Sequence, residues 1–108
     1  MTTKAWHIHP RANDELDAAS ARYERKRVGL AADFLDAFAA TRAALLHTPM
    51  IGTAQQVGRY TVRQALLDGF PHAIVFAEIA DGYLIVAVAH VRRRPRYWRG
   101  RLRGSAPR

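Results

Sequence analysis

The chain has 108 residues, of which 49 % are hydrophobic, and this is enough for one domain with a buried core. The absence of cysteine excludes disulfides, thiolate metal sites and cysteine nucleophiles, and it is compatible with a cytoplasmic protein. No stretch is apolar for long enough to cross a membrane, and the first residues lack the apolar run of a signal peptide. We therefore expect neither a membrane partner nor export.

The net charge of +8 is concentrated at one end of the chain. Residues 1–91 carry equal numbers of cationic and acidic side chains, whereas residues 92–108 hold eight arginines and no acid. This division predicts a single domain over residues 1–91 and a basic C-terminal tail over residues 92–108. Because the excess charge has one sign, we expect the tail to meet a nucleic acid or an acidic protein segment. A frayed, solvated chain end is the alternative.

The N-terminal half is expected to hold one strand and two helices. Alternation of Trp6 and Ile8 with polar neighbours predicts a short strand over residues 5–9. A helix is expected over about residues 12–27, where apolar residues recur at intervals of three and four and acids stand near the start. A second helix is expected over residues 30–47, and the short connection makes the pair an antiparallel hairpin.

Three strands are predicted in the second half, over residues 58–64, 72–79 and 83–90, and Asp81-Gly82 indicates a two-residue hairpin turn. This turn would place one wholly apolar face under the helices: Ala73, Val75, Ala77, Ile79, Leu84, Val86 and Val88. The opposite face would be mixed and half open: Ile74, Phe76, Glu78, Ile85, Ala87 and Ala89. We therefore expect an α+β domain, with an antiparallel sheet of three to four strands and the helical hairpin on one face.

An ordered set of short motifs spans most of the chain: Arg63, Phe70-Pro71, Ala87-Val88-Ala89-His90, Arg93-Arg94-Pro95 and Tyr97-Trp98. This set resembles the ParE branch of the ParE/RelE superfamily, the toxins of type II toxin–antitoxin and plasmid stabilisation systems. Gly29-Leu30 and Phe34-Leu35 fit the same pattern. Two positions depart from it, because His72 and Phe76 stand where tyrosine is usual or common.

The resemblance implies a β-α-α-β-β-β toxin without a cofactor, held inactive by a small cognate antitoxin with an acidic C-terminal segment. The ParE branch implies inhibition of DNA gyrase by binding, without enzymatic activity. The RelE branch implies an endoribonuclease that cleaves messenger RNA on the ribosome. Where members of the RelE branch typically have a GDYR-like segment, this chain has Asp68-Gly69-Phe70-Pro71, and this difference favours the ParE side. A small basic nucleic-acid-binding module is a third alternative, outside the toxin class.

Each alternative has its own candidate residues. Target binding is expected from the basic tail, through Arg92, Arg93, Arg94, Arg96, Tyr97, Trp98 and Arg99. A nuclease would use residues that meet at one end of the sheet: Arg63, His90, Arg93 and Tyr97. In a further arrangement, Tyr97 and Trp98 fold back onto the sheet while the arginines face outward. Truncation after Val91 is expected to abolish toxicity and to keep part of the antitoxin binding.

The antitoxin is expected to cover apolar surface that a single domain leaves open. The candidate residues are Phe34, Leu35, Phe38, Leu45 and Phe76. Acidic residues of the same partner would pair with the arginines and mask them. No metal site is expected, because His7 and His9 point the same way on a strand but lack a third ligand.

Overall fold

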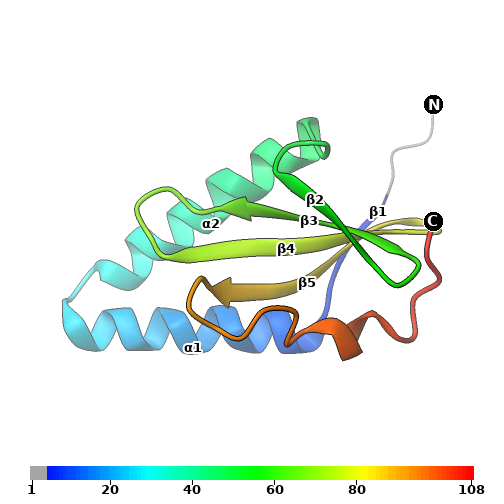
Figure 1. Cartoon of the computed structure of the whole chain (residues 1–108). Coiled ribbons are helices and arrows are strands. Elements are labelled where there is room, and N and C mark those ends of the chain that lie inside the picture. Colours follow the sequence, from blue (N-terminus) through cyan, green and yellow to red (C-terminus); the bar gives the residue numbers. More distant parts are fainter. Residues whose placement is uncertain (1–4) are drawn as a thin grey trace.

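The computed structural model describes residues 5–108, which form a layer of two helices against a five-stranded sheet (Figure 1). The elements are β1 Ala5–Ile8, α1 Pro10–Lys26, α2 Leu30–His47, β2 Thr53–Val57, β3 Tyr60–Leu66, β4 His72–Ile79, β5 Gly82–His90 and the 3-10 turn η1 Arg99–Leu102. The strand order is β1-β5-β4-β3-β2, with β1 parallel to β5 and the other pairs antiparallel. None of the helices in this range is long and apolar enough to span a membrane.

The expected α+β class is confirmed, but the expected antiparallel sheet of three to four strands is wrong. The missed strand is β2, whose sequence Thr-Ala-Gln-Gln-Val lacks the apolar alternation of a half-buried strand. It pairs with β3 across a turn at Gly58. The sheet is mixed because β1 joins β5 in parallel, and the N-terminal strand alone gives no signal of direction.

The helical hairpin follows the prediction closely. α2 has the predicted bounds, whereas α1 begins at Pro10, two residues before the expected start. Proline suits the first turn of a helix because its missing N–H is not needed there. The cap is His9, whose Nδ1 accepts the N–H of Arg11 at 3.0 Å. The Glu24 carboxylate near the end of α1 accepts N–H groups at the start of α2 and fixes the turn between the helices.

The hairpin between β4 and β5 turns one residue earlier than Asp81-Gly82 predicts. Ala77 therefore lies opposite Leu84 and not opposite Val86. Gly82 is already a residue of β5, where it has a φ of 152°. Any Cβ at this position would overlap the main chain of β1, so the glycine allows the parallel strand to approach. The prediction that Asp81-Gly82 forms the turn is therefore wrong, and the glycine is instead required by the close contact between β5 and β1.

The helices cover the face of the sheet that was predicted to be half open, and a β-bulge moves Val88 onto that face. Val75 lies opposite Ala87 while Phe76 lies opposite Ile85, so Val86 is an extra residue in β5. The helices cover one face and bury Ile74, Phe76, Ile85 and Val88 with Phe34, Phe38 and Leu45. The face predicted to meet the helices lies on the other side and holds Val75, Ala77, Ile79, Leu84 and Val86.

The C-terminal segment covers this second face. Trp98 and Leu102 are each 2 % exposed and pack among the side chains of β3, β4 and β5. Tyr60 donates a hydrogen bond from its hydroxyl to the main-chain carbonyl of Leu102 at 2.9 Å, and Pro107 bridges to Ile79. The segment runs back from the end of β5 toward the β4–β5 turn (Figure 1, orange to red). The sheet is thus covered on both sides, and the expected half-open face is wrong.

Candidate functional site

The eight arginines of residues 92–108 divide into two groups. Arg101 and Arg108 are held in ion pairs, Arg101 by Glu15 at 3.0 Å and Arg108 by Glu78 at 2.9 Å. Within residues 5–108 the other six have no acid at ion-pair distance, and all six are exposed: Arg92, Arg93, Arg94, Arg96, Arg99 and Arg103. The unpaired positive charge therefore lies on a segment that packs against the sheet.

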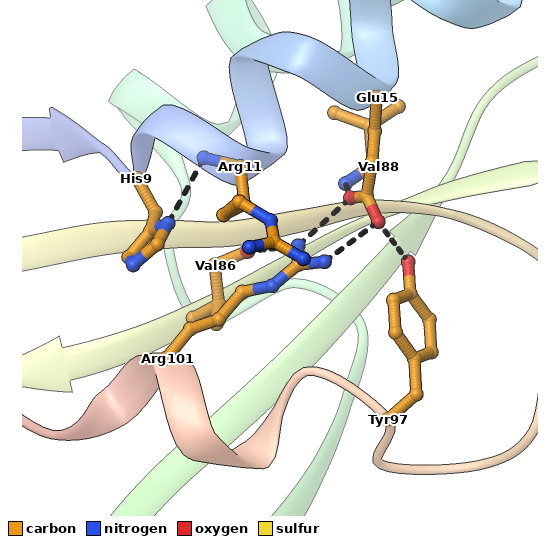
Figure 2. A network of polar contacts seen from close by, with 7 residues as sticks. All are labelled: His9, Arg11, Glu15, Val86, Val88, Tyr97 and Arg101. Carbon is orange, nitrogen blue, oxygen red and sulfur yellow. Dashed lines mark hydrogen bonds and ion pairs between the residues drawn. The ribbon is translucent and has the colours of Figure 1, made fainter.

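Glu15 of α1 anchors this segment (Figure 2). Its carboxylate accepts two bonds from the Arg101 guanidinium, each 3.0 Å long, and one from the Tyr97 hydroxyl at 2.7 Å. It also accepts the main-chain N–H of Val88 at 3.0 Å, and Arg101 donates to the main-chain carbonyl of Val86 at 3.1 Å. One helix, one strand and the basic segment thus meet at a single carboxylate, and we call this group of contacts the Glu15 clasp.

The clasp forms where β5 loses its outer neighbour. β1 pairs with β5 only as far as Ile85, and the chain then turns into α1. The main-chain groups of Val86 and Val88 are satisfied there by Arg101 and Glu15. The side chains of Glu15 and Arg101 are only 17 % and 14 % exposed, so their fork-like pairing is largely removed from water.

The charges in the clasp are well defined. Burial opposes ionisation of Glu15, but the hydrogen bonds from Arg101, Tyr97 and Val88 outweigh it and lower the pKa of this carboxyl. Burial and the bond to Glu15 raise the pKa of Tyr97 above its ordinary value. Tyr97 therefore stays protonated and donates a hydrogen bond to Glu15, which makes it an anchor for the segment and a poor general acid.

Further contacts shape the arginine segment beyond the clasp. The Arg93 guanidinium lies over the Tyr97 ring, 3.9 Å from its centroid. Arg96 reaches back to β2, where Nε and Nη2 donate to Gln55 Oε1 at 3.3 and 3.2 Å. Arg96 also has a φ of 60°, a left-handed conformation that surrounding contacts must maintain. Trp98, expected in the target-binding set, is buried and is unavailable to a partner while the domain is folded.

Three of the four nuclease candidates come together, and one does not. His90, Arg93 and Tyr97 line a pocket of about 450 Å³ between α1 and the end of the sheet. Arg63 lies opposite Phe76, four residues along β4 from the His72–His90 pair, a separation of about 13 Å at ~3.3 Å per residue. Its guanidinium donates to the main-chain carbonyl of Met50 at 3.1 Å and faces Glu78, so the expected cluster is wrong for this residue.

His72 is the chemically distinctive residue of this pocket. It is 2 % exposed, its ring centroid lies 5.1 Å from that of His90, and its Nδ1 lies 3.4 Å from the Tyr23 hydroxyl. Burial lowers the pKa of His72 to about 4, and the nearby His90 and Arg22 add to the effect. His72 is thus neutral near pH 7. The departure from the usual tyrosine gives a second imidazole beside His90.

The residues expected to bind the antitoxin are mostly core residues. Phe34, Phe38, Leu45 and Phe76 are at most 8 % exposed, because the helices cover the face that carries Phe76. Only Leu35, at 41 %, remains accessible. The structure instead has an apolar groove of about 790 Å³ between the end of α2 and the strands β2 and β3. Exposed Ile51 and Leu66 line it, and neither was among the predicted residues.

Sequence reasoning missed the roles of Glu15 and Arg101, although a signal exists for each. Glu15 stands three residues after Ala12 and four before Ala19, so it belongs to the buried stripe of α1 and does not serve as an N-terminal acid. Arg101 follows Trp98 by three residues, the spacing that places both on one side of a helical turn. An ion pair between these partners cannot be read from either segment alone.

The two histidines of the N-terminal strand region have other contacts. His7 lies 3.4 Å from Asp81, and His9 caps α1. No group of three potential ligands gathers among residues 5–108.

Models of known protein families give no match to this chain, and no curated protein compared with it matches either.

Proposed function

We propose that the chain is the toxin of a type II toxin–antitoxin system, and that it binds its target through the exposed arginines of residues 92–99. The observation that carries this proposal is the set of unpaired arginines on a segment held by the Glu15 clasp. Such an arrangement concentrates positive potential on an ordered surface. The motif resemblance to the ParE branch supports DNA gyrase as the target.

A cognate antitoxin would occupy the apolar groove beside β2. The groove and the arginine segment meet at this strand, because Gln55 lines the groove and also accepts the hydrogen bonds of Arg96. An amphipathic segment could bury its apolar side against Ile51 and Leu66. Acidic residues that follow it would then reach the arginines and neutralise them. One partner segment would thus cover both surfaces.

Inhibition of DNA supercoiling by purified gyrase tests the target and the surface together. We compare the wild-type chain with a triple variant, Arg92→Gln, Arg94→Gln and Arg99→Gln. The matched control removes three exposed arginines of the body: Arg25→Gln, Arg42→Gln and Arg59→Gln. The wild type and the control should inhibit equally, and the segment variant should lose inhibition because target contacts are gone. No inhibition by folded wild-type protein would refute gyrase as the target, and full inhibition by the segment variant would refute the surface.

A specific observation favours endoribonuclease activity as the second candidate. His90 lies beside Arg93 in one pocket, with the buried His72 ring 5.1 Å away, so an imidazole and a cation are available there for proton transfer and phosphate binding. Cleavage of messenger RNA in a translating extract tests this activity. His90→Ala should abolish cleavage and Arg63→Ala should leave it unchanged, because Arg63 lies outside the pocket. Absence of cleavage by the wild type would eliminate this candidate.

A further inference from the structure

A pocket of about 470 Å³ lies between the start of α1 and the basic segment, and we call it the α1 pocket. The residues that line it around the Tyr97 side chain are His9, Arg11, Arg93, Arg94, Gly100 and Arg101. The contacts of Tyr97 and Arg101 with Glu15 separate it from the pocket of His72 and His90 (Figure 2). The α1 pocket is therefore a compact site that ends at the Glu15 clasp.

Four arginines meet in the α1 pocket, and no acidic residue lines it. Arg11 and Arg94 are exposed, and neither has an acid at ion-pair distance in the described part of the chain. The charge of Arg101 is balanced by Glu15, and Arg93 is stacked on an aromatic ring. Two guanidinium groups therefore remain free, one from α1 and one from the basic segment. They concentrate positive potential in a small volume.

His9 adds a hydrogen-bond donor to the same pocket. Its Nδ1 accepts the main-chain N–H of Arg11 at 3.0 Å, so the proton of the neutral ring lies on Nε2. Burial lowers the pKa of His9, and the positive charges of Arg101 and Arg11 lower it further. The ring is therefore neutral near pH 7 and donates one hydrogen bond to an acceptor without adding a charge.

Gly100 leaves the wall of the basic segment open. A Cβ at this position would have no atom of a more distant residue within 4 Å. A ligand can therefore approach the main chain of the segment at this point. The same space allows a larger side chain to be placed at the pocket without a clash, and this provides a way to block it.

The lining of the α1 pocket matches a compact anion that carries several charges. A guanidinium group pairs with two oxygens of one phosphate group through parallel N–H bonds, and Arg11 and Arg94 supply two such groups. No leucine, isoleucine or valine of the described part of the chain lines the pocket, so an amphipathic peptide would find little apolar surface. The Glu15 clasp closes the pocket toward β5, and an extended strand has no groove to follow on that side.

We propose that the α1 pocket binds a compact oligophosphate, for which inorganic pyrophosphate is the probe, and that Arg11 of α1 and Arg94 of the basic segment hold its phosphate groups. A free oligophosphate and the phosphate chain of a nucleotide offer the same chemistry, so the pocket is assigned to the group that they share. This binding does not depend on the toxin function, and it gives the start of α1 a role that the surface of residues 92–99 does not include.

Isothermal titration calorimetry of the full chain with pyrophosphate at low salt tests the proposal. One pocket variant is Arg11→Gln with Arg94→Gln, and its matched control is Arg25→Gln with Arg42→Gln, which removes the same charge from exposed residues outside the pocket. A second pocket variant, Gly100→Glu, adds a carboxylate at the open wall. Its control is Ala43→Glu on the exposed side of α2. Circular dichroism checks that each variant keeps its helices.

The wild type and both controls should bind pyrophosphate with similar affinity. Each pocket variant should bind at least about tenfold more weakly, because charge-assisted hydrogen bonds are lost or opposed by a new negative charge. Inorganic triphosphate and ATP are then titrated in the same way. Tighter binding of ATP would identify a nucleotide as the source of the phosphate chain, whereas equal or tighter binding of triphosphate would identify a free oligophosphate.

Three results would overturn the proposal. The first is absence of saturable pyrophosphate binding by the folded wild type at low salt. The second is equal weakening of the pocket variants and their controls. The third is displacement of pyrophosphate by oligo(dT) at equal phosphate concentration, since this would make the pocket part of a surface for nucleic-acid strands. The readout is independent of supercoiling and of RNA cleavage, so failure of those proposals and failure of this one are separate outcomes.

Discussion

The Glu15 clasp allows a quantitative prediction for the substitution Glu15→Gln. The amide keeps the shape of the side chain but removes the charge that Arg101, Tyr97 and Val88 share. Breaking a fully buried ion pair from one side costs about 3–5 kcal/mol. Glu15 and Arg101 keep 17 % and 14 % of their side-chain exposure, and water therefore screens part of the remaining charge. We expect the free energy of unfolding to fall by about 2 kcal/mol.

Urea unfolding at neutral pH measures this loss. In a thermal melt the same change lowers the midpoint by about 8 °C, at ~4 °C per kcal/mol for a domain of this size. The control is Asp17→Asn, on the exposed side of the same helix, which should be close to the wild type. If Glu15→Gln is as stable as that control, the clasp does not hold the segment.

A double-mutant cycle separates the pair from its surroundings. Arg101→Met alone leaves Glu15 with fewer donors, whereas Glu15→Gln and Arg101→Met together remove both charges. The double variant should lose less than the sum of the two single losses, with a coupling of about 1–2 kcal/mol. Additive losses would mean that the two side chains contribute independently, contrary to the bidentate geometry.

Three further predictions concern stability. His72 is neutral when folded, with its pKa lowered to about 4, but gains a proton when unfolded, so stability should fall as the pH drops from about 6.5 toward 4. Between these two pH values, the free energy of unfolding of His72→Phe should fall by on the order of 1 kcal/mol less than that of the wild type. Identical pH profiles of the urea midpoint for the two proteins would contradict this. Gly82→Ala should cost at least about 2 kcal/mol because its Cβ meets the main chain of β1, and a wild-type urea midpoint would show that β1 does not dock there. Truncation after Val91 should remove Trp98 and Leu102 from the core and abolish cooperative melting. A sharp thermal transition of the truncated chain would instead show that residues 92–108 are not needed for folding.

The helical hairpin was predictable because local signals determine it. The apolar periodicity of α2, with Gly29 before it and Thr48-Pro49 after it, gives its bounds without any tertiary information. The strands β4 and β5 were also found, since their apolar runs are long. β2 was missed because both its faces are largely polar and its place at the sheet edge needs no apolar pattern.

The side of the sheet that the helices cover was not predictable, because both faces of β4 and β5 are apolar and the C-terminal segment buries the second one. Val86 bulges out of register, and every side chain beyond it changes sides relative to a regular ladder. Nothing in an unbroken apolar run marks that position. The basic segment presented a different difficulty, since its charges indicate solvent exposure while Trp98 and Leu102 bury a face of the sheet. Contacts between distant segments, such as that of Glu15 with Arg101, cannot be predicted without knowing the three-dimensional fold.

Growth of bacteria that express the chain without an antitoxin tests the working surface most directly. The variant carries Gln in place of Arg92, Arg94 and Arg99, and its abundance and melting temperature are matched to those of the wild type. Growth should stop with the wild type and with the Arg25, Arg42 and Arg59 control, and it should continue with the segment variant. Continued arrest by a folded segment variant would contradict the assignment of the exposed arginines to the target.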